Sequence, residues 1–426
     1  MIKEIKSCRI CGNQKLDSVL DLGQQTLTGV FPHSPTEAIT KGPLELVKCS
    51  EDTNQGCGLL QLRHSYEANE MYGDNYGYRS GLNRSMVEHL GGRVKKLLEL
   101  VQLKAGDLII DIGSNDSTLL QAYGDPRLRL VGIDPTGVKF KKYYPKHIEL
   151  IPDFFSASAV RKHLGNAKAK VITSIAMFYD LESPVSFMRE IFDVLDEDGI
   201  WVFEQSYMPA MLENDSYDTV CHEHLEYYAF RQIKWMADIV GFKIVDVEFN
   251  SANGGSFAVT AAKKMSKAYQ ENTSLVNAVL AEENRKGLSG LEPYRSFKER
   301  IGLQRENIIR FVREVNAKKE KIFGYGASTK GNVILQYCGF TDKDIPFVAE
   351  VNPDKFGRFT PGTAIPIISE REAKAKAPDY FLVLPWHFKD NIVSREKEYI
   401  DAGGALVFPL PQIEIVRNSR KNAREV

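Results

Sequence analysis

The stretch LIIDIGSND at residues 108–116 decides the fold of this chain. Its apolar run is short enough for a buried parallel strand. A glycine turn follows, and Thr118, Leu119 and Leu120 then open a helix. Because glycine has no Cβ, Gly113 lets the backbone approach a ligand closely. The stretch therefore predicts a strand, a ligand-binding turn and a helix in succession.

The alternation of strand and helix continues beyond this turn. Further apolar runs lie at residues 130–133, 171–173 and 200–203, with helical segments between them. Such alternation predicts a doubly wound α/β sheet that binds ligands at the carboxyl ends of its strands. Residues 242–247 and 256–260 read as closing strands, which could run antiparallel.

An acid follows the glycine turn at a distance that suggests a nucleoside. Asp134 ends the next strand, 23 residues after Asp111, and at that offset an acid commonly accepts hydrogen bonds from a ribose diol. Asn115 and Ser117 stand where the dinucleotide pattern has glycines, so the turn favours a cofactor without a pyrophosphate. An ordinary strand–turn–helix is the alternative, and Asp134 argues against it. The residues expected to hold the cofactor are Asp111, Gly113, Ser114, Asn115 and Asp134.

The chain is too long for one hydrophobic core. It has 426 residues, 43% of them hydrophobic and 26% charged, with a formal net charge of −1. This composition is typical of a globular protein and points to neither a nucleic acid nor an anionic membrane as partner. No apolar stretch approaches the length of a membrane span, and the first residues lack a signal-peptide core, so we expect a cytoplasmic protein.

Four of the six cysteines lie within the first 57 residues. Cys8 and Cys11 form a Cys-x-x-Cys pair, Cys49 and Cys57 a wider one, and a glycine follows each pair. Thiolates in this arrangement suit tetrahedral zinc, whereas the alternative is four free, buried thiols. Clustered basic and aromatic residues are missing here, so we expect zinc to order the module rather than to bind nucleic acid.

These patterns divide the chain into successive parts. From residue 321 the strand–helix alternation restarts after a charged, mostly helical segment with a break at residues 287–290. The expected parts are a zinc-binding module at 1–65, a cofactor-binding domain at 66–262 with a lid segment at 66–105, a helical connector at 263–318, a smaller α/β domain at 319–416, and a tail at 417–426.

The run YDTVCHEHLEYY at residues 217–228 gathers imidazoles, carboxylates, a thiol and phenols. On a doubly wound sheet its position overhangs the cofactor. We favour a general base here over a structural hydrogen-bond network. Both are favoured over a metal site of Cys221, His222 and His224, because these residues are too close together to converge easily on one ion.

The motifs together resemble those of S-adenosylmethionine-dependent C-methyltransferases that act on nucleotide-linked 4-keto-6-deoxy sugars. The glycine turn with Asp134 is similar to motif I and its acidic partner in class I methyltransferases. The resemblance covers nearly the whole chain and depends most on NGGS at 253–256, YGASTKGN at 325–332, PGT at 361–363 and LPW at 384–386. It implies a class I methyltransferase (Rossmann-like) core flanked by an N-terminal zinc-binding module and a smaller C-terminal α/β Rossmann-like domain.

The resemblance also implies a reaction, methylation at C3 of the sugar through an enolate. It makes His224 the general base and Glu223 its neighbour, with His222 or a tyrosine hydroxyl stabilising the oxyanion. S-adenosylmethionine and Zn²⁺ are the implied cofactors, and the implied substrate is a nucleotide sugar that carries thymidine or guanosine diphosphate. Cys221 stands where the family has Tyr, and FYD at 178–180 lacks a His found in some relatives. The alternatives are a sugar O- or N-methyltransferase, or a zinc-ribbon adaptor with a degenerate methyltransferase fold.

Further residues are assigned by the same resemblance. Asp153, Phe154 and Ser174 lie where this fold contacts the adenine and the methionine end of the cofactor. Tyr76 and Tyr78 could close over cofactor and sugar, or pack the zinc module against the core. A helix is expected from about Lys330 to Tyr337, and amides and dipole at its start attract phosphate. Lys330 and Asn332 are therefore interpreted as the diphosphate grip, and the alternative is a merely structural helix start. The expected substrate-binding residues are Ser328, Lys330, Asn332, Glu350, Asn253, Trp386 and His387.

Overall fold

The computed structural model of the chain describes residues 2–52, 56–72 and 78–418. Tyr76 of the expected lid and residues 419–426 of the expected tail lie outside these ranges. Within them, no helix combines the length and the apolar character that crossing a bilayer requires.

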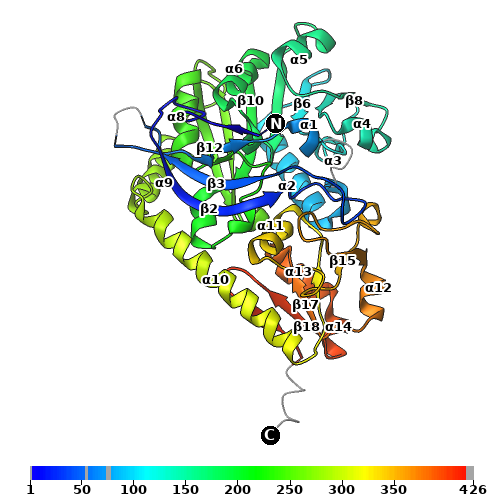
Figure 1. Cartoon of the computed structure of the whole chain (residues 1–426). Helices are drawn as coiled ribbons and strands as arrows, with labels where there is room; N and C mark the ends of the chain where they lie inside the picture. The colour runs from blue at the N-terminus through cyan, green and yellow to red at the C-terminus, as the bar shows by residue number, and fades with distance from the viewer. Residues whose placement is uncertain (1, 53–55, 73–77, 419–426) are drawn as a thin grey trace.

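The middle of the chain is built on a seven-stranded sheet in the order β12-β13-β10-β9-β6-β7-β8 (Figure 1). Its strands are parallel except for β13, which runs antiparallel between β10 and β12. The predicted alternation and the two closing strands are thus confirmed, and one of the closing strands, β13, is antiparallel to the rest. The strands are β6 (Leu108–Ile112), β7 (Arg129–Ile133), β8 (Ile148–Ile151), β9 (Ala169–Ile175), β10 (Leu195–Ser206), β12 (Phe242–Asn250) and β13 (Ser256–Lys263).

Helices cover both faces of this sheet. Ile110 and Ile172 pack on one face with residues of α5, α6 and α8, whereas Ile109 and Val171 pack on the other with α2 and α3. All four side chains are fully buried. Burial on both faces explains why these strands are almost continuously apolar. The helices are α2 (Arg84–Leu100), α3 (Thr118–Gln121), α4 (Gly137–Phe140), α5 (Ala157–Leu164), α6 (Pro184–Val194), α7 (Met208–Glu213) and α8 (Phe230–Val240).

The N-terminal part forms a second sheet, in the order β11-β4-β3-β2. Its edge strand β11 (Glu226–Tyr227) comes from the middle of the chain and pairs with β4, so that Glu226 lies opposite Gln61. The other strands are β2 (Leu16–Thr26), β3 (Lys41–Cys49) and β4 (Leu60–Leu62); β1 (Lys3–Glu4) pairs with β5 (His64–Ser65), and α1 (Ala68–Met71) follows.

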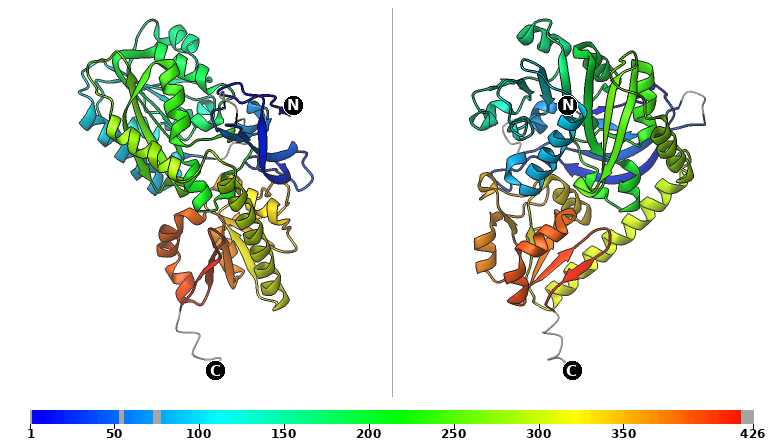
Figure 2. Two further views of the ribbon diagram at one scale, coloured as in Figure 1. Left: turned by 90° about the vertical axis from the view of Figure 1, so that its left-hand side faces the viewer. Right: turned by 180° about the vertical axis from the view of Figure 1, so that it is seen from behind.

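This N-terminal sheet has more regular structure than the sequence predicted. Its apolar side chains Leu44 and Leu46 are fully buried in one cluster with Ile308 of α10 and Val333 of α11. In Figures 1 and 2, β2 and β3 lie against the middle sheet and above the C-terminal sheet. The N-terminal module therefore packs its apolar side chains into a core that it shares with the C-terminal part. This packing stabilises the module besides any metal that it binds.

The C-terminal part carries a six-stranded sheet in the order β16-β15-β14-β17-β18-β19, parallel except at β19. Two helices, α9 (Thr273–Arg285) and α10 (Glu292–Ala317), lead into it, and α10 runs along one side of the molecule down to this sheet (Figure 1). The strands are β14 (Ile322–Tyr325), β15 (Val348–Glu350), β16 (Ile367–Ser369), β17 (Tyr380–Val383), β18 (Ala405–Phe408) and β19 (Glu414–Val416). The helices are α11 (Thr329–Cys338), α12 (Glu370–Ala375), α13 (Lys389–Arg395) and α14 (Lys397–Asp401).

Candidate active site

The glycine turn after β6 adopts the backbone shape that the sequence suggested. Gly113 has φ +72°, and Asn115 and Ser117 have φ +50° and +64°. Both residues stand where the dinucleotide pattern has glycines, and each pays a steric cost of roughly 1–2 kcal/mol for its left-handed backbone. The amide of Asn115 donates to Asp134 Oδ2 at 2.7 Å, so the turn and its acidic partner are joined directly.

Asn115 and Asp116 hold residues 78–81 over this turn. The amide of Ser80 donates to Asn115 Oδ1 at 3.0 Å, and Asn115 Nδ2 donates to the carbonyl of Tyr78 at 3.2 Å. The amide of Gly81 donates to Asp116 Oδ2 at 3.0 Å. The segment therefore covers the glycine turn, while the Tyr78 side chain itself is 46% exposed.

The surface around the turn fits a nucleoside cofactor. Asp134 Oδ1 accepts hydrogen bonds from the amide and hydroxyl of Thr136, and a carboxylate with about four acceptor sites keeps capacity for a ribose hydroxyl. Phe154, just after β8, is 47% exposed and offers an apolar face to an adenine, with the exposed Asp153 beside it. These three residues would hold the nucleoside.

Two other predicted cofactor residues are engaged inside the protein. Asp111 accepts a hydrogen bond from the Thr173 hydroxyl at 2.6 Å, and burial raises the pKa of its carboxyl to about 7. The Ser174 hydroxyl accepts a hydrogen bond from Trp201 Nε1 at 2.9 Å within the sheet core. The Ser174 side chain is therefore engaged in the core of the sheet. The role of Ser174 in cofactor binding stays a prediction.

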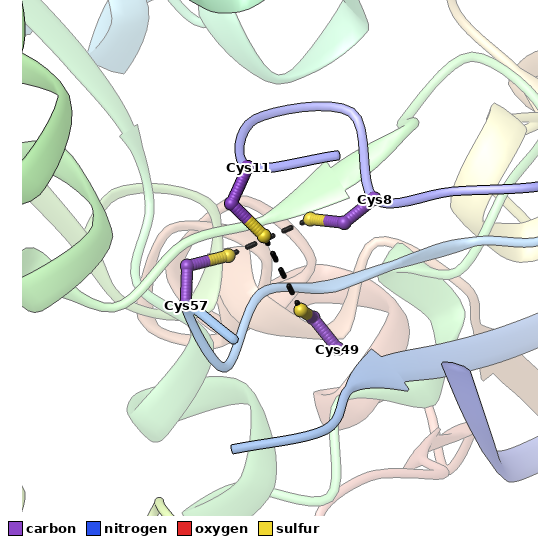
Figure 3. Close-up of side chains that lie close together, drawn as sticks. All are labelled: Cys8, Cys11, Cys49 and Cys57. Atoms are coloured by element: carbon purple, nitrogen blue, oxygen red, sulfur yellow. Dashed lines mark hydrogen bonds between the residues drawn. The ribbon is translucent and has the colours of Figure 1, made fainter. Parts of the chain in front are cut away.

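The four N-terminal cysteines converge on one point (Figure 3). Their sulfur atoms all lie within 4.8 Å of one another, and the Cys8–Cys57 and Cys11–Cys49 pairs are 3.5 Å apart. A tetrahedral zinc ion with Zn–S bonds of about 2.3 Å needs sulfur separations of about 3.8 Å. The cluster thus fits zinc, and within the described ranges no other group of His, Cys, Asp and Glu is arranged to hold a metal.

Arg9, inside the Cys-x-x-Cys turn, joins the cysteine cluster to β11. Its guanidinium donates to the carbonyl of Leu62 at 2.6 Å and to the Ser65 hydroxyl at 2.9 Å. Its Nε lies 3.7 Å from Glu226 Oε1, and both side chains are almost completely buried. Because Glu226 follows His224 by two residues, the zinc module borders directly on the His/Glu cluster.

His224 is arranged to accept a proton. Its Nδ1 lies 2.8 Å from the carbonyl of Thr219, and since a carbonyl only accepts, Nδ1 carries the hydrogen and Nε2 keeps its lone pair. Burial, assisted by the charge of Lys330, lowers the pKa of His224 to about 3, so the ring is neutral at physiological pH. The ring centroid lies 4.3 Å from that of Tyr179. The small cavity that His224 borders is lined by Tyr179, Ser206, Met208, Met211, Thr219, Glu226 and Tyr227.

The two residues before His224 contact other parts of the molecule. His222 is fully buried with its ring 4.6 Å from that of Tyr66, and neither of its nitrogens has a hydrogen bond among the described residues. Glu223 is buried against the N-terminal segment, where a Cβ on Gly29 would come within 2.2 Å of its Oε1. The three-residue metal site is therefore not formed, and His222 does not share the surroundings of His224.

Four predicted substrate residues meet near residues 217–219, the segment whose Thr219 carbonyl bonds His224. Lys330, in the first turn of α11, donates from Nζ to the carbonyl of Asn253 at 2.9 Å. Trp386 Nε1 donates to Asp218 Oδ2 at 2.9 Å. The charge of Lys330 also contributes to lowering the pKa of His387 well below its usual value, after the larger effect of burial. Lys330, Asn253, Trp386 and His387 thus form one polar group between the middle and C-terminal parts.

The remaining three have structural partners. The Ser328 hydroxyl caps α11 by accepting from the amide of Gly331 at 3.0 Å. Asn332 Nδ2 donates to the carbonyl of Thr28 at 2.7 Å and so ties α11 to the N-terminal sheet. Glu350 accepts from the backbone amides of residues 327, 351 and 352. Their expected contacts with a diphosphate stay predictions.

Comparison with known proteins identifies the family. Three family models match successive parts of the chain: "Putative zinc binding domain" at residues 8–72, "Methyltransferase domain" at 84–247 and "C-methyltransferase C-terminal domain" at 251–411. The C-methyltransferase NovU from Streptomyces niveus is 30% identical over 419 residues, which cover 98% of each chain. This chain belongs to the C-methyltransferase family.

The family and the geometry together give the fold and cofactors of this C-methyltransferase. The methyltransferase model confirms the class I core, flanked as predicted by the zinc-binding module and the smaller α/β domain. The enzyme uses S-adenosylmethionine, and its four-cysteine cluster is a zinc site. The predicted alternatives, an O- or N-methyltransferase and a degenerate adaptor, do not agree with this membership.

Two solved structures are similar to the C-methyltransferase over part of its length. The mitomycin 7-O-methyltransferase MmcR is 12% identical, with a TM-score of 0.34 over 43% of this chain and 55% of that chain. The CcbJ methyltransferase from Streptomyces caelestis is 12% identical, with a TM-score of 0.33 over 41% of this chain and 89% of that chain.

Sequence reasoning missed three residues of the C-methyltransferase site. Asp218 and Thr219 lie in the quoted run before the His/Glu cluster, yet only their contacts with Trp386 and His224 give them a role. Tyr179 is noticed in sequence only as part of a segment that lacks a histidine. The sequence offered one signal for Asp218 and Thr219, which is their position shortly before the His/Glu cluster.

Proposed function

We propose that this enzyme methylates C3 of a nucleotide-linked 4-keto-6-deoxy sugar, with His224 as the general base. The supporting observation is the Thr219 carbonyl on Nδ1, which leaves the basic lone pair on Nε2. The ring is only partly buried and borders a cavity. A neutral imidazole with a fixed tautomer beside a cavity is suited to accept a proton from carbon.

Methylation at carbon needs a carbanion, and a C–H bond beside a ketone supplies one as an enolate. His224 takes the C3 proton, and negative charge collects on the C4 oxygen. S-adenosylmethionine, when bound at the Gly113 turn, supplies an electrophilic methyl group. A correctly placed base contributes roughly 10²–10⁴-fold to the rate, and the alignment of the carbanion with the methyl group contributes further.

The C-terminal part supports a nucleotide-sugar substrate. The match to the C-methyltransferase C-terminal domain spans residues 251–411 and includes the NGGS and YGASTKGN motifs. Lys330 and Asn253 from these two motifs contact each other beside His224. Within this proposal thymidine diphosphate and guanosine diphosphate are equally suitable carriers.

The test is the variant His224→Ala. We expect kcat to fall by about 10²–10⁴-fold because the base is lost, while the affinity for S-adenosylmethionine is retained because the residues expected to hold it are unchanged. Methyl transfer from a labelled donor to a panel of 4-keto-6-deoxy nucleotide sugars, read by mass and carbon NMR, measures the rate, and calorimetry measures the affinity.

The matched control is His163→Ala. His163 Nδ1 also bonds a backbone carbonyl, that of Ala159 at 2.9 Å, but it lies exposed on α5. This variant should retain full turnover. Full turnover by His224→Ala would refute the base assignment, and a product methylated on oxygen would refute the reaction itself.

A further inference from the structure

Lys330 is a partly buried cation that keeps donors free for a ligand. An ammonium group has three donors, and among the described residues Lys330 uses one, to the carbonyl of Asn253. Asn253 has a left-handed φ of +54° in the short 3-10 helix η5 (Ala252–Gly254). A non-glycine residue strained in this way is a recurrent sign of a functional position.

The groups around Lys330 are also left incomplete. Asp218, in the short helix η4 (Tyr217–Thr219), is fully buried. Its Oδ2 accepts from Trp386, whereas its Oδ1 has no hydrogen-bond partner in the part of the chain that the structure describes. His387 Nδ1, in η7 (Trp386–Phe388), is likewise buried without a partner. Because buried polar atoms are nearly always paired, these groups indicate the place of a polar ligand group.

We propose that Lys330 stabilises the C4 oxyanion formed when His224 removes the C3 proton, instead of gripping the nucleotide phosphates. This inference rests on the proposed function and offers Lys330 as the oxyanion donor in place of His222 or a tyrosine hydroxyl. His222 packs on Tyr66, which follows β5. Lys330 instead lies in the first turn of α11, which packs against η4, and Thr219 of η4 bonds His224. The same site therefore pairs a base with a cation.

The electrostatics favour the reacting state over the resting one. Before reaction, burial and then the charge of Lys330 keep His224 neutral, so its Nε2 lone pair is free to accept a proton. Proton transfer then creates an imidazolium beside an ammonium, and the negative oxyanion between them offsets both charges. A cation that is better neutralised in the transition state than in the ground state accelerates the chemical step.

The step balances in atoms and electrons. The C3–H electron pair becomes the C3=C4 double bond, the C4=O π pair moves to oxygen, and the proton goes to His224 Nε2. The enolate carbon then bonds to the methyl carbon as the S–CH₃ bond breaks, and that pair stays on sulfur. The carbonyl re-forms at C4, and the proton on His224 is released to water.

The experiment separates carbanion formation from nucleotide binding. Holoenzyme with S-adenosylhomocysteine is incubated with the 4-keto-6-deoxy sugars in D₂O, and deuterium entering beside the ketone is followed by NMR. In Lys330→Met we expect exchange to fall by about 10²-fold or more, as for the loss of an oxyanion donor. Calorimetric affinities for thymidine and guanosine diphosphate should be unchanged.

Two further variants guard against misfolding and nonspecific charge effects. Lys330→Gln keeps a donor for the Asn253 carbonyl without the charge, and it should lose exchange as well. Lys355→Met removes another ammonium of the same domain, one that bonds the Ala327 carbonyl at 2.8 Å, and it should exchange like the wild type.

The outcomes separate this inference from the proposed function. In one outcome, Lys330→Met loses affinity for the nucleoside diphosphates but, when saturated with sugar substrate, exchanges deuterium at the normal rate. This outcome would identify Lys330 as a phosphate-binding residue and overturn the inference. Normal exchange in Lys330→Gln would overturn it too. If the wild type exchanges no hydrogen in any sugar of the panel, the enolate function fails, and the role of Lys330 fails with it.

Discussion

His222 and His224 are two residues apart, yet the fold uses them differently. His224 has its Nδ1 fixed by a backbone carbonyl and borders a cavity. His222 is packed on an aromatic ring, and neither of its nitrogens is paired within residues 2–52, 56–72 and 78–418. From sequence, the cluster could be recognised as chemically active, but the two rings could not be told apart. Their difference depends on Tyr66, which follows β5 and is far from the cluster in sequence.

The residue-scale prediction concerns the variant His222→Phe. Burial lowers the pKa of His222 from 6.5 to about 4, so between these pH values the unfolded chain binds a proton that the folded chain does not. His222 therefore lowers the stability of the wild type as the pH falls. In His222→Phe this pH-dependent loss of stability is absent, because phenylalanine binds no proton. Near pH 7 the variant should fold normally, because the introduced aromatic ring still packs on Tyr66.

The stability of the wild type relative to this variant should fall by about 1.4 kcal/mol for each pH unit between about pH 6 and pH 4. Urea unfolding of both proteins at several pH values measures this difference, in which the other buried groups cancel. A pH-independent difference would contradict the neutral, buried state of His222. Methyl transfer by the variant should remain close to that of the wild type.

Asn115 and Ser117 show a second limit of prediction from sequence at the residue scale. Their identities predicted a cofactor without a pyrophosphate, and the family agrees. Their left-handed backbone, however, is the one that glycine favours. Sequence alone could not show that Asn115 retains this shape while its side chain anchors residues 78–81, because that role depends on a segment far from it in the chain.

At the scale of elements, strands and helices with strong periodicity were predicted well. The parallel strands β6, β7, β9 and β10 and the helix α11 fall where the apolar runs indicated. The short strands β8, β16 and β19 were not predicted, because each has only three or four residues and a partly exposed pattern. Their place in a sheet is decided by their neighbours.

The element-scale prediction concerns the link between the cysteine turn and β11. In Arg9→Met, Glu226 loses its nearest cation and stays buried, so we expect a loss of about 3 kcal/mol in the free energy of unfolding. Glu226→Gln in the same background should recover part of that loss, because the amide carries no charge. The donors lost by the Leu62 carbonyl and the Ser65 hydroxyl are not replaced. A double-mutant cycle by urea unfolding measures the coupling, and additive effects would contradict it.

At the scale of the whole molecule, the sequence indicated the order of the parts but not how they interlock. Residues 217–228 looked like a loop of the middle domain, but β11 within them completes the N-terminal sheet. Lys330 looked like part of a separate nucleotide site, but it lies beside His224. Both are contacts between residues distant in sequence, which local patterns do not encode.

The prediction at this scale is the effect of removing zinc. Chelation, or the variant Cys49→Ala, should loosen the N-terminal sheet and lower methyl transfer, because β4 then no longer holds β11 next to His224. Hydrogen exchange of the amides in β3, β4 and β11 should accelerate, while S-adenosylmethionine affinity is retained. The matched control, Cys338→Ala, removes a buried thiol outside the cluster and should leave the zinc content at the wild-type level.

The pairing of β11 with β4 also constrains how such genes can recombine. A crossover could replace only the first 65 residues by those of a relative. The β4 strand would then come from the relative, whereas its partner β11 would still come from the recipient gene. The backbone hydrogen bonds between Leu60–Gln61 and Glu226–Tyr227 would then have to form between segments of different ancestry. Shuffling between lineages is therefore expected to spare this junction or to transfer both segments together.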